Sequence, residues 1–152
     1  MKKKVLIMVC GLTCLGLLIV GGFKYYSGQK EAQYLTTAVP YVKQVIPEFS
    51  KWDPVVAEKY MSEKFMQKTS DEKFAQAISA LSRVGALEEM DEPVFEEIYS
   101  GDTPQGEKQT IISYTVKARF DTGDAKITLG LLDKDGEFTV YRFNVESEAL
   151  AR

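Results

Sequence analysis

The sequence predicts an α+β protein: an N-terminal transmembrane helix, then about three helices packed on an antiparallel sheet of about four strands. Three observations lead to this prediction. Residues 5–22 contain no charged side chain. Apolar residues then recur at intervals of three and four up to Leu81, as one face of an amphipathic helix requires. From residue 112 onward they alternate with polar ones, which is typical of strands with one buried face.

The N-terminal segment has the pattern of a membrane anchor. Lysines at positions 2–4 precede an uncharged run from Val5 to Gly22. As a helix this run would rise about 27 Å, close to the roughly 30 Å of a bilayer core. The lysines favour a cytoplasmic N-terminus by the positive-inside rule. The lipid bilayer is thus the first predicted partner, and the protein is expected in the cytoplasmic (inner) membrane as a single-pass chain.

This topology divides the chain into four parts. Residues 1–4 form a cytoplasmic tail, 5–22 the anchor, 23–30 a juxtamembrane tether and 31–152 an extracytoplasmic domain. The first 22 residues carry three of the 19 basic residues, so 16 bases face 22 acids after residue 22, a net charge of −6. The overall charge of −3 therefore conceals an acidic domain.

Two other fates of the apolar segment remain open. Signal cleavage near Gly22, ahead of Phe23, would release the domain into the periplasm. Lipidation at Cys14 is the other fate, although Gly11 occupies the position where a lipoprotein usually has leucine. We favour the uncleaved anchor, because the apolar run is longer than the 7–15 residues typical of a signal-peptide core.

The first part of the domain predicts a helix that ends near residue 49. Thr36 or Thr37 is expected to cap it, with Pro40 beginning or kinking it and Pro47 ending or kinking it. The expected buried face consists of Leu35, Ala38, Val39, Val42, Ile46 and Phe49.

Two further helices have clear start signals. Asp53 and Pro54 form an N-cap acid followed by a first-turn proline, and Val56, Tyr60 and Phe65 are then expected to face the core. Thr69 and Glu72 have the spacing of a capping box. The helix that follows carries one apolar stripe, with Gly85 as its left-handed stop. The stripe consists of Phe74, Ala77, Ile78 and Leu81.

The remaining chain predicts a strand meander. A short strand is expected over residues 93–99, a loop over 100–108 and a long strand over 112–120. Another strand follows over 125–131. Asp135 and Gly136 predict a tight hairpin turn before a last strand, in which the alternation shifts and indicates a bulge near Val140. Glu146 onward is expected to be a polar tail.

Composition excludes several classes of site. No histidine is present, and the only cysteines are Cys10 and Cys14 in the apolar segment, so triads, Cys-His dyads and thiolate or imidazole metal sites are excluded from the domain. Its acidity argues against nucleic acid. Asp133 and Asp135 resemble the start of a calcium loop, but Asn144 stands where its twelfth-position glutamate belongs. We therefore expect no metal and no cofactor.

The stretch from about Trp52 to Val145 resembles small bacterial extracytoplasmic domains of the NTF2-like (cystatin-like) superfamily, which have a cone-shaped fold. The resemblance is carried by a helix around Tyr60, the capped helix before Gly85, three long strands, and a close of the form Gly-x-aromatic-x-Val at residues 136–140. It implies the fold and carries over no functional residue. Such a fold hosts many functions.

We therefore predict a non-enzymatic interaction or accessory domain of an envelope complex, binding a partner protein or a second copy of itself. Tyr114, Val116 and Phe120 on the concave sheet face are the candidate contact surface, although Tyr114 also reads as a core residue. Trp52 is a candidate anchor or a buried tryptophan at a helix start. The alternative is a small-ligand-binding or isomerase-like cone, for which no inward general base is evident. The acidic run 88–92 is expected to be a solvated linker or a surface for a basic partner.

Overall fold

The computed structural model describes residues 32–102 and 106–151. The chain divides into two units, Met1–Thr36 and Thr37–Arg152, and everything below concerns the second. Of the first unit only residues 32–36 are described, and they are helical. The predicted anchor 5–22 and tether 23–30 lie outside the described residues. No helix within the described ranges is both long and apolar enough to cross a bilayer.

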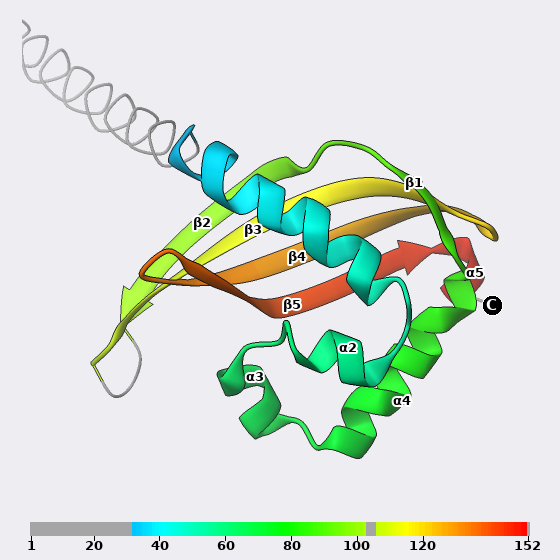
Figure 1. The fold of residues 1–152 in the computed structure, drawn as a ribbon, viewed down its shortest axis with the longest axis horizontal. Helices are drawn as coiled ribbons and strands as arrows, with labels where there is room; N and C mark the ends of the chain where they lie inside the picture. Colours follow the sequence, from blue (N-terminus) through cyan, green and yellow to red (C-terminus); the bar gives the residue numbers. More distant parts are fainter. Residues whose placement is uncertain (1–31, 103–105, 152) are drawn as a thin grey trace, which may run out of the picture. The chain divides into compact units, whose positions relative to one another are not determined.

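The second unit is an α+β domain with an antiparallel sheet, as predicted (Figure 1). Five strands form the sheet, not four, because β1 and β2 both pair with β3 along the same edge. Strand β1 forms within the acidic run that the sequence predicts to be a linker. The strands are β1 (Leu87–Met90), β2 (Val94–Asp102), β3 (Lys108–Phe120), β4 (Gly123–Lys134) and β5 (Glu137–Ser147).

Local turn chemistry sets the register of the long strands. Asp135 and Gly136 both have positive φ, 55° and 88°, so the hairpin between β4 and β5 is the tight turn that the sequence predicts. The predicted bulge is also present. Gly130 pairs with Arg142 and Leu131 with Val140, which leaves Tyr141 as the extra residue. The predicted loop 100–108 is shorter than expected, because β2 continues to Asp102 and β3 begins at Lys108.

Residues 32–49 are helical throughout, so neither Pro40 nor Pro47 interrupts the helix. The predicted cap at Thr36 or Thr37 is wrong, since both residues lie inside the helix and Thr36 Oγ1 donates to the Gln33 carbonyl. Leu35 is 53% exposed and is not part of the buried face. Four other residues of the predicted face are buried, and Val39 is half-buried: Ala38, Val42, Ile46 and Phe49. Val45, which the prediction omitted, is buried as well.

Three short helices follow: α2 (Pro54–Glu58), α3 (Glu63–Lys68) and α4 (Asp71–Leu81). Asp53 caps α2 as predicted, accepting from the Val55 amide at 2.9 Å. The predicted capping box at Thr69 is wrong by one residue, because Ser70 is the N-cap of α4 and accepts from the Lys73 amide. A 3-10 turn, η1 (Ser82–Val84), separates α4 from Gly85, which has the predicted positive φ of 84°.

The N-terminal part of β5 is held on its outer side by the segment between α2 and α3. The Val140 amide donates to the Tyr60 carbonyl at 2.7 Å, and the Ser62 amide donates to the Val140 carbonyl at 2.8 Å. The predicted polar tail from Glu146 onward is wrong: β5 continues to Ser147, and a short helix, α5 (Glu148–Ala151), follows. Arg83 Nη2 of η1 donates a hydrogen bond to the Ala149 carbonyl of this helix.

The core lies between the sheet and residues 37–49. We call this side of the sheet the covered face and the opposite side the open face. The helix of residues 37–49 crosses the covered face (Figure 1). Phe49 stacks on Phe143 of β5 with ring centroids 4.5 Å apart, and Tyr41 contacts Phe138 at 5.7 Å. The described residues therefore fill one face of the sheet and leave the other uncovered.

Candidate functional site

The three apolar candidates of strand β3 lie on the covered face. Tyr114 and Phe120 are each 1% exposed, and Val116 is completely buried. Tyr114 is in register with Leu129, which is in register with Phe143, the residue that stacks on Phe49. Helix 37–49 thus occupies the space over these side chains. The structure places them in the core, not on a surface available to a partner.

Trp52 follows the turn of residues 50–51 at the end of the helix 32–49, and its φ is 53°. Its indole Nε1 donates a 2.7 Å hydrogen bond to the Gly85 carbonyl, and its ring is 6.0 Å from that of Phe120. The side chain is half-buried with its polar atom satisfied within the domain. Of the two interpretations of Trp52, this placement matches the packed tryptophan and not an exposed anchor.

A small apolar hollow lies between α3, α4 and β5. Its volume is about 140 Å³, below the roughly 300–1,000 Å³ of typical ligand pockets. Tyr114 does not line it. The lining residues are Phe49, Met61, Phe65, Phe74, Ala77, Ile78, Leu81, Tyr141, Arg142 and Phe143. The hollow therefore gives no support to a catalytic cone built around Tyr114.

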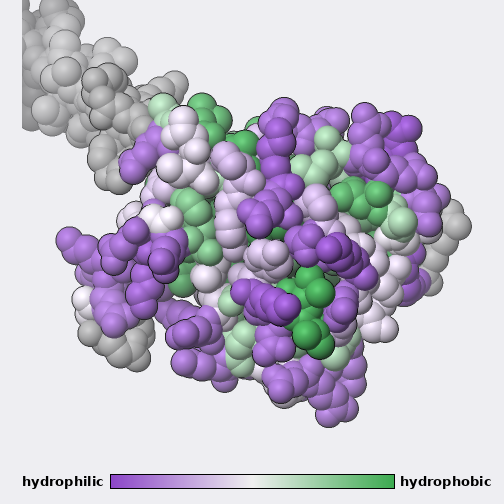
Figure 2. Space-filling view, in the orientation of Figure 1, coloured by the Kyte–Doolittle hydropathy of each residue, from purple (hydrophilic) through white to green (hydrophobic). Residues whose placement is uncertain are grey.

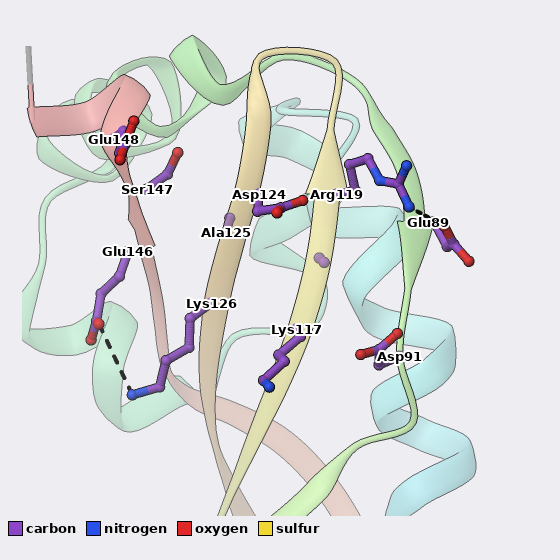
Figure 3. Close-up of a pocket in the computed structure, with 11 residues that line it drawn as sticks. Glu89, Asp91, Lys117, Arg119, Asp124, Ala125, Lys126, Glu146, Ser147 and Glu148 are labelled. Carbon is purple, nitrogen blue, oxygen red and sulfur yellow. Dashed lines mark hydrogen bonds and ion pairs between the residues drawn. The ribbon is translucent and has the colours of Figure 1, made fainter.

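A larger concavity lies on the open face, where the sheet meets α5. This groove has a volume of about 570 Å³ and is open to solvent. Its charged side chains come from β1, β3, β4, β5, α5 and the residue after β1, and Figure 3 shows them on one side of the sheet. They are Glu89, Asp91, Lys117, Arg119, Asp124, Lys126, Glu146 and Glu148.

Strand register arranges these charges in rows. Arg119 is in register with Glu89 on one side and Asp124 on the other, and its Nη2 is 2.7 Å from the Glu89 carboxylate. The next row runs acid, lysine, lysine, acid, because the Asp91 amide donates to the Lys117 carbonyl and Glu146 is in register with Lys126. Lys117 of β3 stands directly opposite Lys126 of β4, with the same sign of charge.

Lys126 has a distant partner at the edge of this second row. Its Nζ lies 4.0 Å from Glu146 of β5, and both side chains are more than half exposed (Figure 3). Lys117 has no ion pair among the residues that the structure describes. The bases of the groove therefore lie on the two central strands, and most of its acids lie on the flanking strand and helix ends. Such an arrangement suits the docking of a surface that carries both signs of charge.

The sequence indicates the residues of this groove but not its role. Alternation along the strands predicts a wet face for Lys117, Arg119 and Lys126, which is where they lie. Sequence alone does not show that acidic residues of β1 and α5 lie on either side of these basic residues. The acidic run 88–92 lines one side of the groove with Glu89 and Asp91. Glu92 of the same run instead forms an ion pair with Lys43 at 2.7 Å.

Among the described residues, no side chain of the groove has the surroundings of a general acid or base. Its carboxylates lie on an open surface, with no apolar surrounding of the kind that poises a catalytic acid or base. Within residues 32–102 and 106–151, no three metal-ligating side chains of the His, Cys, Asp and Glu types converge on one point. Partial burial raises the pKa of Tyr41 to about 12, with a smaller contribution from Tyr60, but this half-buried phenol packs on the Phe138 ring and lies outside the groove.

Away from the groove, the surface offers little for apolar docking. Hydrophilic side chains dominate the face shown in Figure 2, and the hydrophobic ones on it gather in small groups. The exposed large apolar side chains of the second unit, Val55, Val94 and Tyr99, lie on α2 and β2. The groove on the open face is thus the main candidate site.

Comparisons with known proteins add little to this picture. No protein-family model matches the sequence, and no curated protein matches it either. Among solved structures, the chain is similar to Aln2 from a Streptomyces species, at 13% sequence identity and a TM-score of 0.40. The match covers 78% of this chain and 93% of Aln2.

Proposed function

We propose that this protein is a non-enzymatic, membrane-anchored extracytoplasmic domain with an NTF2-like cone fold, which binds a partner protein as an accessory of an envelope complex. One observation carries the proposal: the face that a cone-shaped enzyme or ligand binder would use is filled. Tyr114 and Phe120 are 1% exposed beneath helix 37–49. A buried face leaves surface recognition as the available mode of binding.

The open face is the proposed contact surface, in place of the concave face that the sequence suggested. Its groove of about 570 Å³ presents charged side chains from four strands and α5 on a rigid sheet. Binding sites on regular elements hold their side chains in place better than sites on loops. Exposed charges at an interface mainly set the rate and specificity of association, so the groove suits reversible recognition of a charged partner.

The proposed anchor explains why a modest interface is sufficient. A domain held at the membrane by residues 5–22 searches for a membrane-bound partner at a raised effective concentration. The charges on either side of the apolar run favour an extracytoplasmic domain. The lysines at positions 2–4 stay inside in this topology, which leaves the acidic domain outside.

Site-specific photocrosslinking in the native cell tests the proposal. Asn144 pairs with Thr128 on the open face, is exposed, and lies beside the lysine row, so a photoreactive residue there samples the groove. Gln76, exposed on α4, is the control position. We expect a discrete crosslinked species from Asn144 and none from Gln76. No crosslink from Asn144, or equal crosslinking from both positions, would contradict the proposal.

A further inference from the structure

One edge of the sheet is formed by a strand that has a neighbour on one side only. Strand β2 pairs with β3 and with no other strand in the described part of the chain, and no other segment of that part makes a backbone hydrogen bond to it. After a register shift between Phe95 and Glu97, its pairing with β3 is regular from Glu97 to Asp102. The backbone groups of this stretch that point away from β3 therefore form an edge that can accept one more strand.

Three side chains of β2 lie along this edge on the open face. Val94, Glu97 and Tyr99 are in register with β3 residues that alternate with the buried Ile112 and Tyr114, so the three share the opposite side of the sheet. Val94 and Tyr99 are 61% and 62% exposed, and Glu97 is exposed between them. The edge thus presents one acid between two apolar side chains, beside a row of backbone groups.

The charge of the edge selects the strand that can pair with it. Residues 87–102 contain seven acidic residues and no basic one. Glu97 has no ion pair within the described ranges, and Ser113, its register partner on β3, is uncharged. A second copy of this chain would bring the same acids to the edge, so like charges would oppose each other. A strand with a basic side chain beside Glu97 brings the opposite charge.

We propose that β2 accepts, as a sixth strand of the sheet, an extended segment of a different protein that carries a basic residue between two apolar residues at alternate positions. Backbone hydrogen bonds to the edge supply affinity, and the alternate side chains supply specificity. The apolar residues of the segment cover Val94 and Tyr99, and its basic residue pairs with Glu97. The inference goes beyond the proposed function, because it concerns the edge of the sheet and not the groove on its open face.

Two synthetic peptides test the inference on the purified full-length chain. One has the sequence Thr-Val-Thr-Arg-Thr-Val-Thr with both ends capped, and in the other glutamate replaces the arginine. Hydrogen exchange of the backbone amides, measured by mass spectrometry at increasing peptide concentration, reports where and how tightly each peptide binds. We expect the arginine peptide to protect residues 94–102 and to bind about threefold or more tightly than the glutamate peptide.

A charge reversal at Glu97 provides the matched variant. Glu97→Lys should reverse the preference between the two peptides, whereas Glu58→Lys, the same charge change at an exposed residue of α2, should keep it. Absence of binding by either peptide, protection outside β2, or an unchanged preference in Glu97→Lys would overturn the inference.

Photocrosslinking in the native cells tests whether a segment occupies the edge there. A photoreactive residue at Glu96, which is exposed within the register shift, samples the edge. We expect a discrete crosslinked species whose yield falls about threefold or more in Glu97→Lys and is unchanged in Glu58→Lys. A species with the mass of two copies of this chain would refute a different protein as the occupant. No crosslink from position 96, with the crosslink from position 144 still present, would overturn this inference and leave the proposed function standing.

Discussion

The indole Nε1 of Trp52 donates a 2.7 Å hydrogen bond to the carbonyl oxygen of Gly85. The bond joins the turn that follows helix 37–49 to the turn that precedes β1. The same region receives the β3–β4 turn, because the Thr122 hydroxyl donates to the Val84 carbonyl at 2.6 Å and the Asp121 amide donates to the Ala86 carbonyl. Three distant segments therefore meet at Gly85 and hold the helix against the sheet.

Removing the indole N–H should weaken this junction. Trp52→Phe keeps an aromatic ring near Phe120 but leaves the Gly85 carbonyl without its donor, so we expect a loss of about 1–2 kcal/mol in the free energy of unfolding. Urea denaturation of the purified chain measures the change. Val55→Ala, at a side chain 67% exposed, is the control and should shift it by no more than about 0.5 kcal/mol. Equal effects of the two variants would refute the role of the bond.

Gly85 itself should tolerate no side chain. Its backbone, with φ of 84° and ψ of −153°, lies in a region that is essentially restricted to glycine, and a Cβ would collide with the Asp121 carboxylate. We expect Gly85→Ala to cost more than about 2 kcal/mol. Adding Asp121→Ala should recover only part of the loss, since it removes the collision and leaves the strained backbone. Full recovery in the double variant would show that strain contributes nothing.

Removing the Phe49 ring should create an apolar ligand site beneath helix 37–49. Phe49 is 1% exposed and stacks on Phe143, so Phe49→Ala is expected to cost about 3–5 kcal/mol and to leave an apolar void. Such voids bind small apolar molecules. Benzene should therefore raise the thermal midpoint of the variant by more than that of the parent, whose hollow beside Phe49 is only about 140 Å³. Equal stabilisation of parent and variant by benzene would contradict the prediction that the substitution opens a new void.

The half-buried phenol of Tyr41 should make stability fall at high pH. Burial raises its pKa to about 12 from the ordinary value of about 10, so the unfolded chain loses this proton before the folded chain does. The stabilisation is complete below pH 10 and is lost as the pH rises toward 12. We expect the free energy of unfolding to fall more steeply over this window in the parent than in Tyr41→Phe. Parallel pH profiles would contradict the assignment.

Much of the fold follows from local sequence signals. The Asp53-Pro54 start, the Asp135-Gly136 turn and the bulge near Val140 depend on the chemistry of adjacent residues, and all three predictions are confirmed. Local sequence signals mislead where two neighbouring residues suit the same role, or where tertiary packing compensates for a helix breaker. Ser70 caps α4 in place of Thr69, and helix 32–49 accommodates Pro40, because packing of the helix outweighs one missing backbone hydrogen bond.

The candidate site depends on long-range contacts that a single sequence does not show. Alternation correctly predicts that Tyr114, Val116 and Phe120 share one sheet face. It gives no information on whether a helix covers that face. The opposition of Lys117 and Lys126 requires the exact pairing of β3 with β4, which the turn at Gly123 sets. Periodicity identifies faces, whereas tertiary packing decides which face is free.

The central claim of the proposed function is that a partner protein covers the open face of the sheet, and that the domain lies outside the cytoplasm. Thiol labelling tests it in intact cells, with Cys10 and Cys14 replaced by alanine and one new cysteine introduced. Glu137→Cys lies at the exposed start of β5, and Asn144→Cys lies on the open face. We expect a membrane-impermeant maleimide to label Glu137→Cys rapidly in intact cells and Asn144→Cys several-fold more slowly, with equal rates in the purified chains. Labelling of neither cysteine before lysis, or equal rates in intact cells, would contradict the account.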